Sequence, residues 1–274
     1  MIATFSDSLI LGLVQGITEF LPISSSGHLV IFKQILSIPE LPVTFDIVFH
    51  FATLLAVLTR FYKDIHVILN SFIHGLSSLF RGKSFRTIYD QDAAFRLLIF
   101  LLIGTVPAAV VGLIFKEAVI GLFASPAAVS IFLIITGLVL LSTWWIPRHY
   151  SEMTYGQAFL IGVAQACALL PGVSRSGTTI ACALWLGIAP EKAARFSFLL
   201  AVPAIFGALL LQLFEVPFGE LRQQAGLLLI GAAAAYASGL AAIIVLLRVI
   251  ERGKFFWFGL YCVALGTLLF TFSG

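Results

Sequence analysis

Charged residues are scarce in this chain of 274 residues. Lysine, arginine, aspartate and glutamate together make up 11% of it, whereas a soluble domain carries about 25%. Apolar residues take their place at 60% of the sequence, and the mean hydropathy is +1.08. This balance argues against an ordinary soluble enzyme and predicts an all-α, polytopic membrane protein.

Cysteine is equally scarce. The three cysteines, Cys167, Cys182 and Cys262, lie inside apolar runs without CxxC spacing. That pattern argues against a disulfide framework or a zinc site and predicts small core residues. The sequence also lacks a basic cluster interleaved with aromatic residues, so nucleic acid is not expected as a partner.

Six segments are apolar enough to be full membrane spans, which need roughly 20 residues each. Five of them are free of charged residues, and the sixth, Ile47–Thr59, becomes long enough when it is extended to Tyr62. The five are Leu97–Phe115, Ala118–Ile146, Phe196–Phe214, Gln223–Leu247 and Phe255–Phe272.

Two further apolar regions are interrupted by proline, glycine and polar residues. Ser8–Thr18 and Phe20–Phe32 flank Glu19 and the break "LPISSSGH", while Tyr155–Leu170 and Ser176–Ile188 flank the break "PGVSRSG". Each half is too short to cross a membrane alone. Short apolar halves around such a break indicate discontinuous or re-entrant helix pairs, and their irregular backbone must line a cavity or be buried in protein.

The two broken regions repeat each other at a constant offset of 150 residues. "GLVQGITEFLPISSSG", starting at Gly12, aligns with "GVAQACALLPGVSRSG", starting at Gly162. In this alignment Ser25 falls opposite Arg175. A second echo, "FATLLAV" and "FSFLLAV", has a slightly different offset. The chain is therefore interpreted as an internal duplication.

The duplication predicts a single integral membrane domain, 1–274, with repeat halves of approximately 1–146 and 147–274. Three spans in each half give the halves opposite orientations. If each broken pair returns to the side from which it entered, twelve cations fall on one side of the membrane and three on the other. The positive-inside rule then makes the side with twelve cations the inside and the side with three the outside. The twelve are Arg60, Lys63, Arg81, Lys83, Arg86, Arg96, Arg148, Lys192, Arg195, Arg248, Arg252 and Lys254, and the three are Lys33, Lys116 and Arg222.

In this arrangement both chain ends face outward, and the two breaks enter the membrane from opposite sides. Their tips then meet near the midplane. The sequence thus predicts that Ser24–His28 and Ser174–Gly177 share one pocket.

The predicted pocket combines an arginine with hydroxyls, glycines and two helix starts. The guanidinium of Arg175 stays charged, so within apolar sequence it needs an anionic partner. Helix N-termini bind anions through their N–H groups, and two of them beside an arginine indicate a phosphate or pyrophosphate site. The structural alternative is an ion pair between Arg175 and Glu19 beside a serine-rich turn. The residues expected to bind phosphate are Ser24, Ser26, Gly27, Ser174, Ser176 and Gly177.

Glu19 and His28 are the other candidates for chemistry. Glu19 could ligate Mg²⁺ or Ca²⁺, relay a proton or balance Arg175, and Gln15 shares its helix face at i, i+4 spacing. His28 could act as general base, general acid or nucleophile, or could be a hydrogen-bonded structural residue. The remaining histidines, His50, His66, His74 and His149, lie at span ends or in loops and are not expected in the site.

The paired motifs "QGITEFLPISSSGH" and "PGVSRSGTT" resemble those of the bacterial undecaprenyl-pyrophosphate phosphatase family, also known for bacitracin resistance. The resemblance covers essentially the whole chain in length, span pattern and motif order. It implies a multi-pass enzyme of the bacterial plasma (inner) membrane that removes the terminal phosphate of a C55 isoprenoid pyrophosphate. The monophosphate that results is the lipid carrier for peptidoglycan synthesis.

The resemblance also implies roles for residues. Glu19, Ser25, His28 and Arg175 are the expected catalytic residues, with His28, a serine or water as the attacking group. Glu19 and Gln15 match the family's metal-binding pair, so a divalent cation, Mg²⁺ or Ca²⁺, is the expected cofactor. Gln15 is the uncharged option at its position, which weakens metal ligation there. The family further implies an inverted-repeat fold with the active site facing the outer side.

Two other functions fit part of the pattern. A phosphatidic-acid-type phosphatase would carry a further histidine shortly after its SR motif, and "SRSGTTIACALWLG" has none. An isoprenoid-phosphate transporter or flippase remains an alternative, because inverted repeats and broken helices are also features of transporters. The expected partners are an isoprenoid pyrophosphate and membrane lipids, and the sequence leaves a homodimer open.

Overall fold

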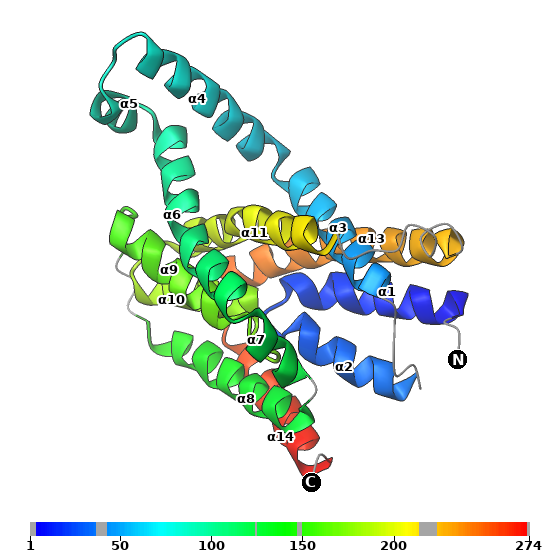
Figure 1. Cartoon of the computed structure of the whole chain (residues 1–274). Helices are drawn as coiled ribbons and strands as arrows, with labels where there is room; N and C mark the ends of the chain where they lie inside the picture. Colours follow the sequence, from blue (N-terminus) through cyan, green and yellow to red (C-terminus); the bar gives the residue numbers. More distant parts are fainter. Residues whose placement is uncertain (1–3, 37–42, 124, 147–149, 214–223, 273–274) are drawn as a thin grey trace.

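The computed structural model describes residues 4–36, 43–123, 125–146, 150–213 and 224–272, and the regular structure of this part is entirely helical (Figure 1). The predicted all-α class is therefore confirmed for the described residues. The helices are α1 (Phe5–Phe20), α2 (Ser25–Ile35), α3 (Val43–Arg60), α4 (Tyr62–Phe80), α5 (Phe85–Gln91), α6 (Ala93–Ile114), α7 (Lys116–Phe123), α8 (Pro126–Ser142), η1 (Thr143–Trp145), α9 (Tyr155–Cys167), α10 (Arg175–Trp185), α11 (Pro190–Leu213), α13 (Ala225–Glu251) and α14 (Trp257–Phe272). Arg148, His149, Phe214, Arg222 and Gln223, which enter the predictions above, lie outside the described residues.

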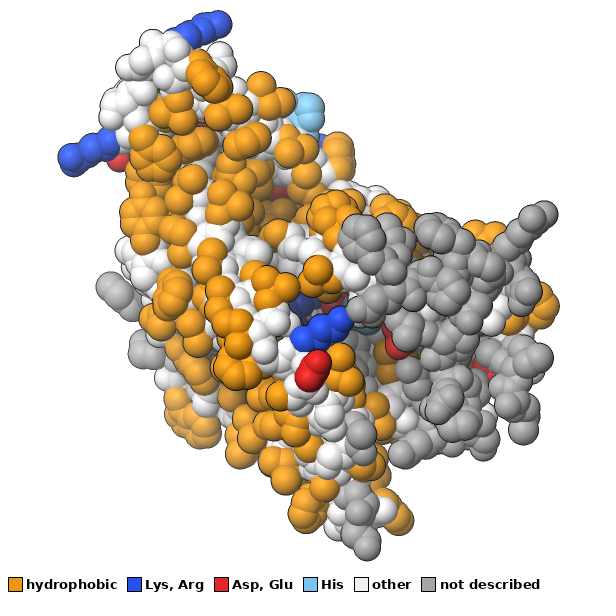
Figure 2. Space-filling view, in the orientation of Figure 1, with side chains coloured by type: hydrophobic (Ala, Val, Ile, Leu, Met, Phe, Trp, Pro, Cys, Tyr) orange, Lys and Arg blue, Asp and Glu red, His pale blue; other side chains and the backbone are white. Residues whose placement is uncertain are grey.

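Among the described residues, four helices are long and apolar enough to cross a membrane, namely α6, α8 with η1, α11 and α13. A fifth crossing is present if α3 and α4, which meet at a bend of 81°, form one broken span. α14 is apolar but has only 16 residues. Apolar side chains cover much of the molecular face drawn in Figure 2, and charged side chains occupy only a few places on it. The chain is therefore a multi-pass membrane protein.

One predicted span is wrong. Ala118–Ile146 is not one span, because α7 ends at Phe123 and α8 begins at Pro126. Ser125 caps α8 by accepting a hydrogen bond from the Ala128 N–H at 3.3 Å, and proline is favoured in the first turn of a helix. The cation-rich segment after α3, for which no element was predicted, folds into α4 and α5.

Both broken regions are helix–break–helix units. α1 and α9 open with the same capping box, in which the N-cap threonine, Thr4 or Thr154, exchanges hydrogen bonds with the third helical residue. Each of these helices ends shortly before a proline, Pro22 or Pro171. Proline disfavours helical backbone in the residue before it, and Leu21 accordingly has the extended ψ of 143°. The second helices, α2 and α10, pack against α1 and α9, respectively.

Helices from the two predicted halves pack closely on one another. α1 lies along α13, α9 along α6, and α8 along α14 (Figure 1). A Cβ atom built on Gly12 would lie 2.2 Å from the carbonyl oxygen of Gly231, and one on Gly162 would lie 2.3 Å from that of Gly104. Backbones this close require glycine, and small residues are the usual means by which membrane helices approach each other.

Two of the cations predicted to share one side lie close together where α3, α11 and α13 meet. Arg60 and Arg195 line a cavity of about 290 Å³ together with Glu191 and Glu251. Arg195 also forms an ion pair with Asp64 of α4. The carboxylates offset part of the positive charge at this end of the bundle.

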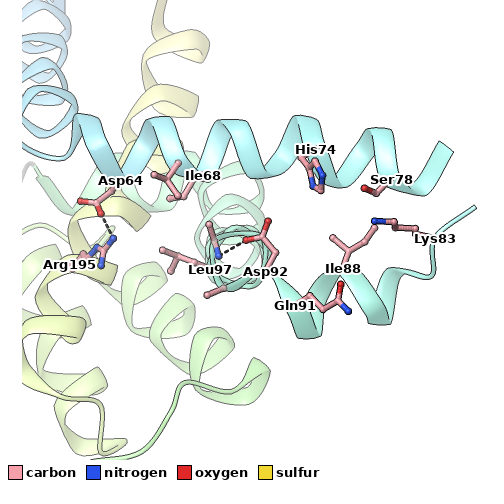
Figure 3. A pocket seen from close by; sticks show the side chains of 13 residues that line it. Asp64, Ile68, His74, Ser78, Lys83, Ile88, Gln91, Asp92, Leu97 and Arg195 are labelled. Atoms are coloured by element: carbon pink, nitrogen blue, oxygen red, sulfur yellow. Dashed lines mark hydrogen bonds and ion pairs between the residues drawn. The ribbon is translucent and has the colours of Figure 1, made fainter. Parts of the chain in front are cut away.

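A larger cavity, of about 610 Å³, lies between α4, α5, α6 and α11 (Figure 3). The Asp64–Arg195 pair borders it on one side, and Lys83 and His74 lie toward the other (Figure 3). Inside, Asp92 accepts a hydrogen bond from the Ser71 hydroxyl at 2.5 Å. None of the residues predicted to bind phosphate lines this cavity.

The glycine contact between α6 and α9 can be tested with two alanine substitutions in one helix. G162A places a methyl group against the Gly104 backbone and should lower the free energy of unfolding by about 1–3 kcal/mol. G156A, also in α9, is the control, because nothing lies within 4 Å of its Cβ position. Unfolding of the purified protein in detergent measures both, and equal stability of the two variants would contradict the close packing.

Candidate active site

The two breaks contact each other at the centre of the fold. Gly172 donates its N–H to the Ser26 hydroxyl at 3.2 Å, and the Ser176 hydroxyl donates to the carbonyl oxygen of Leu21 at 3.4 Å. A Cβ atom on Gly177 would lie 3.3 Å from that of Pro22. The structure therefore brings the two breaks into contact, while the pocket that Ser24–His28 and Ser174–Gly177 were predicted to share stays a prediction.

The serines build matching starts for α2 and α10. Ser24 Oγ accepts a hydrogen bond from the Gly27 N–H at 3.4 Å, and Ser174 Oγ accepts one from the Gly177 N–H at 3.2 Å. In each turn a second serine hydroxyl lies beside the first, with 3.2 Å between Ser24 and Ser26 and 3.4 Å between Ser174 and Ser176. Two helix N-termini lined with hydroxyls thus lie at the contact between the breaks.

Ser24 has a left-handed backbone, with φ of 69°, and is the only non-glycine residue with positive φ in the described part of the chain. Such a conformation costs about 1–3 kcal/mol and persists only where the surroundings impose it. The turn directs the carbonyl oxygen of Ser24 toward His28, whose Nδ1 lies 2.8 Å away. The strained residue therefore helps to fix a candidate catalytic side chain.

Glu19 is the centre of a buried polar cluster. Its Oε1 accepts a hydrogen bond from Arg175 Nη2 at 3.0 Å, while its Oε2 accepts bonds from Ser25 Oγ at 2.9 Å and Gln15 Nε2 at 3.0 Å. His50 Nε2 lies 3.9 Å from the same Oε2. The side chains of Glu19 and Arg175 are only 8% and 14% exposed, so water screens their attraction weakly.

Several polar atoms near these breaks have no hydrogen-bond partner among the described residues. They include Arg175 Nη1 and Gln15 Oε1, and both amide atoms of Gln165, the repeat counterpart of Gln15. Unsatisfied buried polar atoms cost about 1–3 kcal/mol each and call for an unseen partner. The guanidinium donor suits an anionic oxygen, and the Gln15 carbonyl suits a cation or a proton donor.

His28 lies in the same turn but faces another helix. Its Nε2 is 2.6 Å from the hydroxyl of Tyr261 in α14, and the two rings stack with centroids 5.7 Å apart. Both ring nitrogens thus have partners in Ser24 and Tyr261. The sequence prediction placed His28 beside the anion site without a defined partner, and the structure supplies two.

Two residues near the site were missed by the sequence reasoning. His50, which was not expected in the site, points Nε2 toward Glu19, while its Nδ1 lies 2.7 Å from the carbonyl oxygen of Asp46. Its position directly before the repeated "FATLLAV" segment is the signal that could have drawn attention to it. Tyr261 carries no comparable signal, because aromatic residues are common in apolar helices.

The cysteines are outside this cluster and all three are free thiols. Cys262 is buried, as predicted for a core residue, and its thiol donates to the carbonyl oxygen of Pro22 at 3.5 Å. Cys167 is exposed, so its predicted burial is wrong.

The cluster offers few ligands for a metal ion. Within the described residues no group of three or more His, Cys, Asp and Glu side chains could hold one. Glu19 and the unpaired Oε1 of Gln15 do supply two oxygen donors on one helix turn. A hard cation could complete its coordination only with water or with oxygens of a bound phosphate.

Comparison with known proteins gives one consistent result. The family model described as "Bacitracin resistance protein BacA" matches residues 8–268. The undecaprenyl-diphosphatase of Salinibacter ruber is 41% identical over 270 residues, which cover 97% of this chain and 98% of that protein. Proteins of the same name from Korarchaeum cryptofilum and Desulfosudis oleivorans are also 41% identical, over 261 and 266 residues. These cover 95% and 94% of this chain, and 96% and 94% of theirs.

A double-mutant cycle tests the buried Glu19–Arg175 pair. Either Glu19→Ala or Arg175→Ala leaves one buried charge unpaired, which should cost about 3–5 kcal/mol of unfolding free energy. The double variant should cost clearly less than the sum, because no charge is then left alone. Unfolding of the purified protein in detergent measures the three variants.

The exposed pair Lys192–Glu152, with 2.8 Å between nitrogen and oxygen, is the matched control. Its alanine cycle should give a coupling of about 1 kcal/mol or less, because water screens it. Additive effects at Glu19 and Arg175 would contradict a buried, mutually dependent pair.

Proposed function

Because the chain belongs to the family of the bacitracin resistance protein BacA, we propose that it is a membrane phosphatase acting on undecaprenyl pyrophosphate. It hydrolyses this lipid to undecaprenyl phosphate and inorganic phosphate, which returns the lipid carrier to peptidoglycan synthesis and confers resistance to bacitracin. The observation that carries the proposal is the buried arginine at the junction of two serine- and glycine-rich helix starts, with Nη1 of Arg175 unpaired among the described residues.

The substrate pyrophosphate binds at this junction. Arg175 donates to a phosphate oxygen through Nη1, and the first turns of α2 and α10 direct their N–H groups and serine hydroxyls toward it. The isoprenoid tail remains among the apolar helices. Phosphoryl transfer depends mainly on positioning and on stabilisation of negative charge, and this junction supplies both.

Ser25 is the nucleophile that the geometry favours. Its hydroxyl already donates to Glu19 Oε2 at 2.9 Å, which is the distance a general base needs. The Ser25 oxygen attacks the terminal phosphorus as Glu19 takes the proton, and the bond to the bridging oxygen breaks to release undecaprenyl phosphate. Water then hydrolyses the phosphoserine, which gives inorganic phosphate and restores the hydroxyl. His28 is not placed to attack in this arrangement, because Ser24 and Tyr261 hold both its ring nitrogens. Its part is to hold, through Nδ1 and the Ser24 carbonyl oxygen, the turn that presents Ser25 to the phosphorus.

A divalent cation, Mg²⁺ or Ca²⁺, is part of the proposal. Gln15 Oε1 is a buried acceptor without a partner among the described residues, and it lies one helix turn from the Glu19 carboxylate, so these two residues would hold the cation. When bound, the cation supplies positive charge that neutralises phosphate oxygens. The uncharged Gln15 makes this a weak protein site that is completed by the substrate.

We also propose the finer membrane arrangement. The halves 1–146 and 147–274 form an inverted repeat with two re-entrant pairs and six spans, in a bacterial plasma membrane, with the pocket open to the outer side. In support, the capping boxes at Thr4 and Thr154 and the close contacts at Gly12 and Gly162 recur at the offset of 150 residues. The shared end of Arg60 and Arg195 agrees with their predicted common side.

Transport of an isoprenoid phosphate is a second candidate function. The two broken helix pairs, each packed on a helix of the other half, resemble the substrate sites of transporters. Hydrolysis and transport differ in one product, because transport leaves the pyrophosphate bond intact.

Release of inorganic phosphate from C55 and C15 pyrophosphates by the purified protein in detergent tests the proposed reaction. The wild type should release phosphate, and Glu19→Gln should release it about 10²–10⁴-fold more slowly because the general base is lost. An inactive wild type, with lipid movement across vesicles intact, would contradict hydrolysis and favour transport.

The nucleophile is tested by trapping. With a label on the terminal phosphate, acid quenching should leave labelled protein, and peptide mapping should place the label on Ser25. Ser25→Ala should abolish the adduct, whereas Ser84→Ala, at an exposed serine that makes no side-chain capping bond, should leave it unchanged. Full turnover by Ser25→Ala without any adduct would exclude this covalent route.

A further inference from the structure

His28 is held between two partners of different character. The carbonyl oxygen of Ser24, 2.8 Å from Nδ1, can only accept a hydrogen bond, so Nδ1 carries a hydrogen. In the neutral ring Nε2 is therefore the bare nitrogen and accepts from the Tyr261 hydroxyl at 2.6 Å. The contact with Ser24 thus fixes the tautomer and leaves Nε2 as the nitrogen that can exchange a proton.

Tyr261 suits this place because a hydroxyl both donates and accepts. It can donate to bare Nε2 and can accept from Nε2–H when the ring is protonated. Its ring also stacks on the imidazole, with 12° between the planes, which restricts rotation of His28. A phenylalanine would keep the stacking and lose only the hydrogen bond.

The two residues come from opposite ends of the chain, 233 positions apart. α2 carries His28 directly after the Ser24–Gly27 segment, and α14 carries Tyr261. α14 is fixed in turn by close contact with α8, where a Cβ on Gly259 would lie 2.6 Å from the carbonyl oxygen of Gly137. Tyr261 therefore connects the first phosphate-binding turn to a rigid helix pair.

We propose that Tyr261 is a positioning residue of the phosphatase site, which holds His28 in one orientation and one tautomer beside the phosphate-binding turn. The inference rests on the proposed function, because it assigns Tyr261 a part in the same reaction. It acts through His28 and makes no contact with the reacting phosphate. The hydroxyl is therefore expected to affect turnover more than substrate binding.

Kinetics of Tyr261→Phe test the role. The value of kcat for phosphate release should fall about 10-fold, the effect of one lost hydrogen bond, while KM changes less than about twofold. In a His28→Gln background the same substitution should have no further effect, because Tyr261 acts through the histidine. Tyr236→Phe is the matched control, since it removes a tyrosine hydroxyl that donates to Thr59 at 3.2 Å, whereas the hydroxyl bonded to His28 is that of Tyr261.

An NMR signature separates this inference from the proposed function. With ¹⁵N-labelled histidine in detergent, His28 should show the Nδ1–H tautomer. The Tyr261→Phe substitution should shift the Nε2 resonance of His28, whereas the Tyr236→Phe substitution should leave it as in the wild type. An active wild type whose Tyr261→Phe variant has unaltered kcat and an unaltered His28 spectrum would overturn the inference alone. An inactive wild type that still shows the His28 shift would overturn the proposed reaction and leave the contact in place.

Discussion

The ion pair between Glu19 and Arg175 is the interaction on which the rest of the site depends. It joins two residues that are 156 positions apart in the chain, one from each broken region, and it does so where both side chains are largely removed from water. A buried pair of this kind is weak evidence for added stability, because desolvation offsets much of the attraction. The pair instead makes the arrangement of the breaks specific. Moving either side chain away would leave the other charge buried and unpaired, so the two breaks are held in register.

An irregular backbone inside an apolar bundle needs partners for its polar groups, and the fold supplies them from within. Thr136 of α8 illustrates this, since its hydroxyl donates to the carbonyl oxygen of Gly172 at 3.0 Å and accepts from the N–H of Ser174 at 3.2 Å. Ser26 accepts the N–H of Gly172 in the same way. Once these backbone groups are satisfied, the polar atoms that have no partner among the described residues, such as Arg175 Nη1, are the ones available to a ligand.

Much of this arrangement could be predicted from the sequence, because the repeated motif fixes which residues correspond. The meeting of the breaks followed from the offset that places Ser25 opposite Arg175. The contacts of His50 and Tyr261 could not be predicted, because they depend on how α3 and α14 pack against the breaks, and packing leaves no local pattern. The division between α7 and α8 was missed although Ser125 and the proline after it are a local helix-start signal, because the apolar run hides it.

The proposed reaction requires the pyrophosphate to bind at the junction of the breaks and not in the cavity between α4, α5, α6 and α11. A structure of the protein with an isoprenoid analogue in which CH₂ replaces the bridging oxygen tests this requirement. The terminal phosphonate should lie within hydrogen-bond distance of Arg175 Nη1 and next to the Ser25 hydroxyl. A phosphonate bound instead in that cavity, near Lys83, with the Glu19–Arg175 cluster unchanged, would rule out binding at the junction.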